Sequence, residues 1–381
     1  MSDDETMRAE EMIAGERVFN FSSGPAVMPL EVLRRAAEEL PALPGVGMSV
    51  MEISHRSRWA DEIFAETEAR LRRVLSVPDD YRVLFLQGGG SLQFSMVPIN
   101  YLRRDASADY LLTGYWGRKA IAEARREGTV HVAWSGEGHR FDRMPVAPEE
   151  LELDPEAAYV HVTSNETIQG VQFPGDPLAG VDLGAVPLVC DGSSDFLSRP
   201  IDVSHYGLLY ACAQKNAGPA GLSIVVVSDA LLERGKQGLH SMLDYRRHAE
   251  AGSRYNTPPV FAVYLFRLVL EWLEDRFGGL ERLGEHNRRK AELLYAALDE
   301  HADYYRGHAR PEFRSSMNVT FRTPDEDTDR AFLRGAEELG MHQLAGHRSV
   351  GGVRASIYNA MPLAGVERLA EYLHDFRRRS G

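Results

Sequence analysis

Short apolar runs that alternate with helical patterns constrain the fold of this 381-residue chain more than any other feature. The runs are largely apolar, which is typical of strands covered on both faces of a sheet. Helical patterns separate them, as over residues 119–126, and this alternation predicts a mainly parallel α/β sheet. The expected strands are residues 83–86, 110–112, 159–162, 186–190, 208–212 and 223–227.

The last third of the chain has a different pattern and predicts a smaller α+β domain. Its expected elements are helices at 261–277 and 280–298, a strand at 318–321, a helix at 328–339, a strand at 353–357 and a helix from about 363. We therefore expect an N-terminal extension at residues 1–16, a large domain at 17–259 and a small domain at 260–381. The first segment of the large domain is expected to pack on the small one.

Composition excludes several classes of protein. The chain has 56 acidic and 43 basic residues and a net charge of −13, which disfavours nucleic-acid binding. Its two cysteines, Cys190 and Cys212, cannot build a disulfide scaffold or a cysteine-rich zinc cluster, and we expect no metal site. We expect no membrane span, since the most apolar helix pattern is short and carries Arg267 and Glu271. The acidic start has no apolar signal region, so we expect a cytoplasmic protein.

Lysine is rare in this sequence, and Lys215 is the only charged residue between positions 207 and 228. Burying an unpaired ammonium group is costly, so this side chain must reach water, a partner or a covalent bond. Burial would also lower its pKa and make the amine nucleophilic, as Schiff-base chemistry requires. A loop lysine that extends into solvent fits the pattern equally well. The other three lysines are expected to be solvated: Lys119, Lys236 and Lys290.

Two more features lie where predicted strands end. Asp191 follows the strand at 186–190, and ligands of open α/β sheets bind at such carboxyl ends. This aspartate could hold a pyridine nitrogen protonated, or it could cap a turn. Gly88-Gly89-Gly90-Ser91 ends a strand and opens a helix, where free N–H groups favour a phosphate, although a plain glycine turn also fits. The absence of Walker, dinucleotide, GxSxG and HExxH motifs disfavours the corresponding enzyme classes.

Glycine turn, strand-end aspartate and isolated lysine, in this order, resemble the fold-type I pyridoxal-phosphate (PLP) enzymes. Blocks spread over residues 18–379 narrow the resemblance to the phosphoserine aminotransferase family of class V. The blocks are NFSSGPA at 20–26, MEISHR at 51–56, GYW at 114–116, NET at 165–167, LSRPIDV at 197–203, AQKNAGPAG at 213–221, YNTPP at 255–259, GHR at 346–348 and IYNAMP at 357–362.

The resemblance implies a PLP site with a role for each matched residue. Lys215 would bind the cofactor covalently and later move a proton between Cα of the substrate and C4′ of the cofactor. Asp191 would pair with the pyridine nitrogen, Trp116 would stack on the ring, and Thr167 would hydrogen-bond its phenolic oxygen. The cofactor's phosphate would be held by Gly90, Ser91 and Gln214, with Asn256 and Thr257 from the other subunit. The family thus implies a homodimer with shared active sites.

The resemblance also implies how anionic substrates are bound. Arg354 would hold the α-carboxylate, because a guanidinium group donates two parallel hydrogen bonds. Ser23 would lie at the substrate mouth. The phosphate, or the distal carboxylate of glutamate, would be held by Arg56 together with His55, His347 and Arg348 from the facing subunit.

The implied reaction is the conversion of 3-phosphohydroxypyruvate and L-glutamate into O-phospho-L-serine and 2-oxoglutarate. This is a step of serine biosynthesis, and family members often also act on the phosphorylated-threonine step of pyridoxine biosynthesis. The chain departs from one branch of the family, which has an arginine in place of Ser91 and a glycine in place of Leu92. We therefore expect the hydroxyl and the backbone N–H groups to bind the phosphate.

Three alternatives remain open at this stage. A serine–glyoxylate type of transaminase shares the fold. A cysteine desulfurase also shares it, but needs a cysteine on a mobile loop, whereas Cys190 and Cys212 lie on predicted buried strands. A binding dimer that has lost catalysis would have no physical need to keep Lys215, Asp191 and the arginines together.

Overall fold

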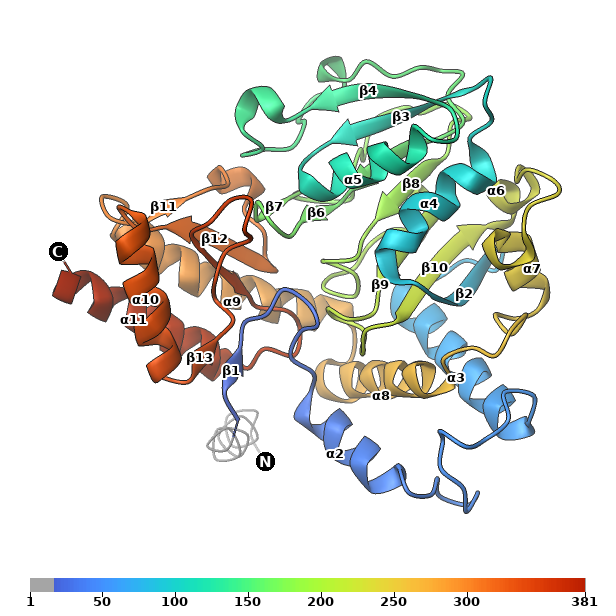
Figure 1. The fold of residues 1–381 in the computed structure, drawn as a ribbon, viewed down its shortest axis with the longest axis horizontal. Helices are drawn as coiled ribbons and strands as arrows, with labels where there is room; N and C mark the ends of the chain where they lie inside the picture. Colours follow the sequence, from blue (N-terminus) through green and yellow to red (C-terminus); the bar gives the residue numbers. More distant parts are fainter. Residues whose placement is uncertain (1–16, 381) are drawn as a thin grey trace.

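A seven-stranded sheet forms the centre of the larger part of the molecule (Figure 1). The computed structural model describes residues 17–380, so the expected extension at 1–16 lies outside the described residues. Only β10 is antiparallel to its neighbours, which confirms the prediction of a mainly parallel sheet. The strand order is β2 (Tyr81–Gln87), β10 (Leu222–Ser228), β9 (Leu208–Cys212), β8 (Leu188–Asp191), β5 (Val160–Thr163), β3 (Ser107–Leu112) and β4 (Thr129–Ser135).

Helices cover both faces of this sheet. On one face, α3 (Arg58–Leu75) and α8 (Val260–Phe277) share an apolar core with the inward side chains of β2 and β10. On the other face, α4 (Gly89–Tyr101) and α5 (Tyr115–Ala124) enclose a second core. Coverage on both faces explains why the central strands are largely apolar. The remaining helices here are α2 (Leu30–Glu39), α6 (Asp229–Glu233) and α7 (Tyr245–Glu250).

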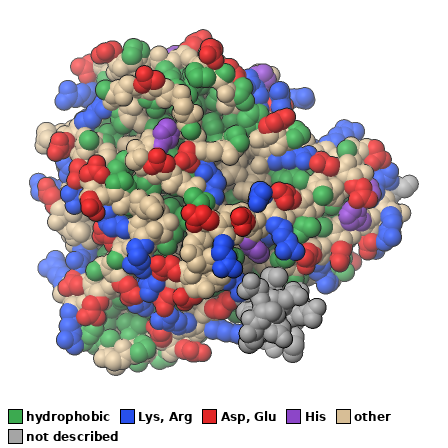
Figure 2. Space-filling view, turned by 180° about the vertical axis from the view of Figure 1, so that it is seen from behind, with side chains coloured by type: hydrophobic (Ala, Val, Ile, Leu, Met, Phe, Trp, Pro, Cys, Tyr) green, Lys and Arg blue, Asp and Glu red, His purple; other side chains and the backbone are tan. Residues whose placement is uncertain are grey.

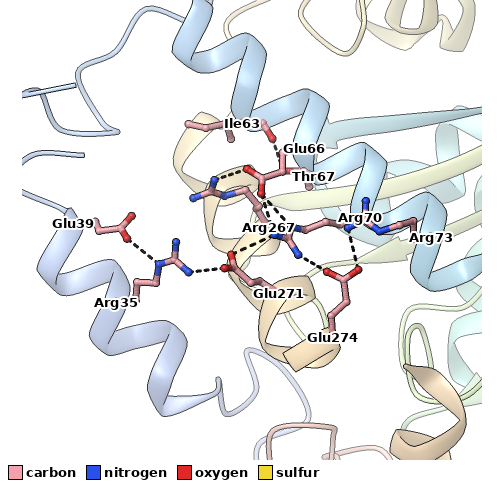
Figure 3. A network of polar contacts seen from close by, with 10 residues as sticks. All are labelled: Arg35, Glu39, Ile63, Glu66, Thr67, Arg70, Arg73, Arg267, Glu271 and Glu274. Atoms are coloured by element: carbon pink, nitrogen blue, oxygen red, sulfur yellow. Dashed lines mark hydrogen bonds and ion pairs between the residues drawn. The ribbon is translucent and has the colours of Figure 1, made fainter. Parts of the chain in front are cut away.

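Ion pairs join α2, α3 and α8 on their outer side (Figure 3). Arg35 of α2 contacts Glu271 of α8 at 2.9 Å, and Arg267 of α8 contacts Glu66 of α3 at 2.6 Å. Each such surface pair stabilises the fold by only about 0–1 kcal/mol, so apolar packing between the helices dominates their association. Acidic and basic side chains are also interspersed over the face shown in Figure 2.

The smaller part of the molecule has its own sheet and its own core. The sheet order is β11 (Arg306–Gly307), β12 (Asn318–Arg322) and β14 (Val353–Ser356), all antiparallel. Three long helices pack on it: α9 (Leu280–Glu300), α10 (Glu326–Glu338) and α11 (Leu363–Ser380). The first described strand, β1 (Phe19–Asn20), pairs with β13 (Met341–His342), so the start of the described chain packs on this part. None of the helices within residues 17–380 is long and apolar enough to cross a membrane.

Helix α8 packs with the larger part rather than the smaller one. Its side chains Val263, Phe266 and Leu270 are fully buried in the core shared with the seven-stranded sheet. Along α9, Leu283 still belongs to that core, whereas Ala291 belongs to the smaller core. A boundary at residue 259 stays a prediction, and we propose from this packing that the boundary lies within α9.

The expectation that Lys290 is solvated is wrong. This lysine is fully buried, and its ammonium group donates hydrogen bonds to three backbone carbonyls. The acceptors are Ile357 at 3.0 Å, Tyr358 at 2.8 Å and Met361 at 3.3 Å. Burial lowers the pKa of Lys290 to about 7. Lys119 is exposed as expected, whereas Lys236 is partly buried against Glu127 and the carbonyl of Leu102.

Candidate active site

Lys215 lies in the connection between β9 and β10, at the edge of the sheet where the parallel strands end. Its Nζ donates to Thr167 Oγ1 at 2.9 Å and lies 5.9 Å from the centre of the Trp116 ring. Thr167 follows β6 (Asn165–Glu166), and Trp116 lies in the first turn of α5. The structure therefore brings together three residues that the sequence predicts to share a site.

The pKa of Lys215 differs from the expectation drawn from burial alone. Burial lowers this pKa, but Tyr358, Cys212, Asp191 and Glu166 all raise it, and the net shift is upward. The expected lowering is therefore wrong in this state of the protein. These four acidic side chains together raise the pKa more than burial lowers it, so the ammonium form of Lys215 is favoured.

Asp191 is buried at the end of β8, next to the lysine. Its Oδ1 accepts a hydrogen bond from the backbone N–H of Ser193 at 2.9 Å. Burial raises the pKa of Asp191, and the contact with Ser193 and the charge of Lys215 oppose this rise. A buried carboxylate is stabilised by a cationic partner, which a protonated pyridine nitrogen would supply.

The glycine turn opens helix α4 as predicted. Gly88 and Gly89 have φ of 93° and 62°, conformations that favour glycine, and α4 starts at Gly89. A Cβ on Gly90 would lie 3.3 Å from Ser193 Oγ, so the turn lies close to the segment after Asp191. The N–H groups of a helix start attract an anion, and Ser91 adds a hydroxyl there. Gln214 precedes Lys215, and its Nε2 lies against Gly24.

Asn256 and Thr257 lie in the exposed segment before α8. The carbonyl of Thr257 accepts a hydrogen bond from Gln87 Nε2 at 3.4 Å, at the end of β2. The neighbouring Tyr255 is 46% exposed. Thr257 is exposed and Asn256 is half-buried, which leaves both side chains at least partly accessible to another subunit.

Arg354 of β14 presents an unsatisfied guanidinium group to the site. Its Nε is buried and has no hydrogen-bond partner, and no carboxylate within residues 17–380 forms an ion pair with it. Burial lowers the pKa of Arg354, and Tyr358 opposes this shift. Tyr358 connects the groups of the site, because its hydroxyl donates to the carbonyl of Ser23 at 3.0 Å and its charge state influences Lys215.

His347 and Arg348 of this chain lie near Arg354. The ring of His347 lies 5.1 Å from the ring of Tyr115, the neighbour of Trp116. Burial lowers the pKa of His347, and the charges of Arg354 and Arg348 lower it further. By contrast, Arg56 is exposed in the turn before α3, where its Nε contacts His55 at 3.3 Å.

Comparison with known proteins identifies the family. The class-V aminotransferase family matches residues 18–369. The phosphoserine aminotransferase of Laribacter hongkongensis is 52% identical over 96% of this chain and 99% of its own length. The chain belongs to the phosphoserine aminotransferase family. This finding confirms the predicted family and the fold-type I class, and the chain is a PLP-dependent aminotransferase.

Two solved structures of this family share the whole fold. The phosphoserine aminotransferase from Bacillus circulans subsp. alkalophilus is 45% identical, with a TM-score of 0.93 over 96% of this chain and all of its own. The PLP-bound enzyme from Trichomonas vaginalis is 39% identical, with a TM-score of 0.87 over 94% of this chain and all of its own.

The residues of this chain fit the PLP that the family uses. The buried carboxylate of Asp191 forms no ion pair within residues 17–380, and the charge of Lys215 acts on it only from a distance. The buried Nε1 of Trp116 has no hydrogen-bond partner. A Cβ on Gly89 would meet no atom within 4 Å, so the start of α4 is open to a phosphate. An aromatic face, a nitrogen partner and a phosphate cradle thus surround the amine of Lys215.

Glu166 is a further residue of the site, and the sequence marks it only as a member of the NET block at 165–167. This fully buried carboxylate accepts hydrogen bonds from the backbone N–H groups of Trp116 at 3.1 Å and Gly117 at 3.0 Å, and from Thr113 Oγ1 at 3.1 Å. Burial raises its pKa to about 7, and these three contacts oppose the rise. Glu166 fixes the first turn of α5 and therefore the position of the Trp116 ring.

Replacing Glu166 by glutamine should remove a pH dependence of stability. The raised pKa of about 7 means that the folded state holds this proton more tightly than the unfolded state, so wild type loses stability as the pH rises from about 4.5 to 7. We expect the unfolding free energy of the Glu166→Gln variant, relative to wild type, to rise by up to about 3 kcal/mol between pH 4.5 and 8. Urea unfolding across this range measures it, with the exposed Glu149→Gln as control. Parallel curves for Glu166→Gln and wild type would contradict the prediction.

Proposed function

We propose that this family member interconverts 3-phosphohydroxypyruvate and L-glutamate with O-phospho-L-serine and 2-oxoglutarate. The observation that carries the proposal is the unpaired guanidinium group of Arg354, with a second cation, Arg348, and the ring of His347 beside it. Both amino acids of this reaction carry an α-carboxylate and a second anionic group. One arrangement of cations can therefore serve both half-reactions.

The proposed roles follow from the contacts of each residue. Lys215 binds the cofactor and moves the proton at the substrate Cα, with Thr167 Oγ1 2.9 Å from its Nζ. Asp191 holds the pyridine nitrogen, and Trp116 covers the ring. PLP, when bound, supplies the electron sink for the amino-group transfer. Its phosphate is assigned to Gly90, Ser91 and Gln214.

We propose a homodimer in which each site takes residues from both subunits. The half-buried Asn256 and the exposed Thr257 complete the phosphate site of the facing subunit. The family resemblance implies that His347 and Arg348 come from the facing subunit, but their place beside Tyr115 and Arg354 favours the same subunit. We assign the exposed loop with His55 and Arg56 to the facing site instead.

The pathway follows from the proposed reaction. Serine biosynthesis uses this step, whereas the phosphorylated-threonine step of pyridoxine biosynthesis and the cytoplasmic location stay predictions. A cysteine desulfurase is disfavoured, because burial raises the pKa of the Cys190 thiol well above its usual value and Cys212 is also buried.

A half-reaction spectrum tests the proposed substrate. Purified holoenzyme is mixed with O-phospho-L-serine in one cuvette and with L-serine in another, and the visible absorbance of the bound cofactor is followed. We expect rapid loss of this absorbance with phosphoserine and a much slower loss with serine. An equal response to serine would indicate a broader small-amino-acid transaminase. An unchanged spectrum with both would favour a binding dimer that has lost catalysis.

A further inference from the structure

A cavity of about 310 Å³ lies where the turn after β4 meets the small sheet. Backbone of the segment 346–351 forms one wall, and β11 and β12 form another. The proposed function uses only one of its lining residues, Arg354. The arginines that line it are Arg140, Arg306, Arg322 and Arg354, and His308 lines it as well. We refer to this cavity as the arginine pocket.

Positive charge in the arginine pocket is not compensated. Its one lining carboxylate, Asp142, already accepts a hydrogen bond from Arg310 Nε at 3.1 Å. None of the four lining arginines forms an ion pair with a carboxylate of residues 17–380. This differs from the helix surface in Figure 3, where Arg35 and Arg267 each contact a glutamate. Arg140, Arg306 and Arg322 are exposed, so solvent screens their charges, and a bound anion would supply the counter-charge that they lack.

The walls of the pocket are held in place by hydrogen bonds. His308 Nε2 donates to the carbonyl of Phe141 at 3.1 Å, and the backbone N–H of Arg310 donates to the carbonyl of Asp142 at 2.9 Å. These contacts fix the turn after β4 against the small sheet. Arg322 also donates to the carbonyl of Val350 across the pocket. The pocket is therefore a built feature of the fold and not a gap between loosely placed side chains.

We propose that the arginine pocket binds a small phosphate monoester. Guanidinium groups match the oxygens of a phosphate with pairs of parallel hydrogen bonds. A volume of about 310 Å³ is at the lower end of small-molecule sites, which span roughly 300–1,000 Å³, so it accommodates an organic group beside the phosphate. The proposal rests on the cavity and on Arg140, Arg306 and Arg322, the lining arginines that the proposed reaction does not use.

Calorimetric titration of the holoenzyme with β-glycerol phosphate tests the proposal. The test variant, Arg306→Gln/Arg322→Gln, removes two lining arginines. The control, Arg334→Gln/Arg368→Gln, removes two exposed arginines of the same part of the molecule that do not line the pocket. We expect wild type and the control to bind one more equivalent per subunit than the test variant. Equal stoichiometry in all three proteins would overturn the proposal.

Two further measurements complete the test. A parallel titration with inorganic phosphate distinguishes the ester from the free ion, and we expect the ester to bind at least several-fold more tightly; equal affinity would assign the pocket to free phosphate. If the test variant does not retain the cofactor absorbance, wild-type holoenzyme crystals soaked in selenate decide the question. Anomalous density against Arg306 and Arg322 would support the site, and an empty pocket at saturating selenate would refute it.

Discussion

The Lys215→Ala variant should lose the covalent attachment of PLP and nearly all transaminase activity. Lys215 is the only lysine whose Nζ lies beside the ring of Trp116 and the hydroxyl of Thr167 within residues 17–380. Proton transfer by a positioned side chain contributes about 10²–10⁴-fold to a rate, so we expect a loss on the order of 10³-fold or more. Borohydride reduction followed by peptide mapping measures the covalent bond, and the coupled transaminase assay measures the rate.

The exposed Lys119 provides the matched control for this experiment. Its replacement by alanine removes the same side chain from the surface of α5 and should leave both trapping and rate unchanged. Trapping at another lysine in the Lys215→Ala variant would show that the assignment is wrong. Lys290 is the candidate to examine then, since burial lowers its pKa to about 7.

The sequence predicted the sheet because its strands are covered on both faces. Largely apolar runs marked every central strand and the mostly buried edge strand β2, but the pattern missed β4, the other edge strand, whose first residues are partly exposed. Polar residues such as Thr129 and His131 interrupt the apolar run there. An apolar run therefore identifies the buried strands of such a sheet, edge strand β2 included, more readily than a partly exposed edge strand such as β4.

Lys290 shows why a charged neighbourhood in sequence misleads. Arg288 and Arg289 precede it, which suggested a solvated helix surface. Yet Leu283, Lys290 and Leu294 are separated by seven and four residues, so they share the inward face of α9. Three carbonyls from the distant segment 357–361 satisfy the ammonium group, and a local pattern cannot reveal partners so far along the chain.

Site residues were predicted through the family blocks rather than through local chemistry. Lys215 and Asp191 stood out by themselves, because one is isolated and the other ends a strand. Glu166 did not, since its role depends on N–H groups of α5 that lie about 50 positions away in the sequence. The direction of the Lys215 pKa shift was also missed, because it depends on four groups that only the fold brings together.

Among the site residues other than Lys215, Arg354 is the one whose replacement should impair substrate binding most. The guanidinium group is partly buried, and its Nε has no partner within the described chain, so a substrate carboxylate would satisfy donors that are otherwise unpaired. We expect Arg354→Gln to lower kcat/KM by about 100-fold or more for both phosphoserine and glutamate, since a paired charge-assisted contact is lost. Steady-state kinetics with each amino acid measures this loss.

Arg354→Lys separates charge from geometry at the same position. Lysine keeps the positive charge but loses the planar fork, so we expect it to recover only about a tenth of the lost kcat/KM, mainly through KM. Full recovery would mean that charge alone suffices and that the two-pronged contact is not formed. The exposed Arg334→Gln on α10 is the control and should behave as wild type. A loss confined to phosphoserine would contradict the assignment, because the α-carboxylate is common to both substrates.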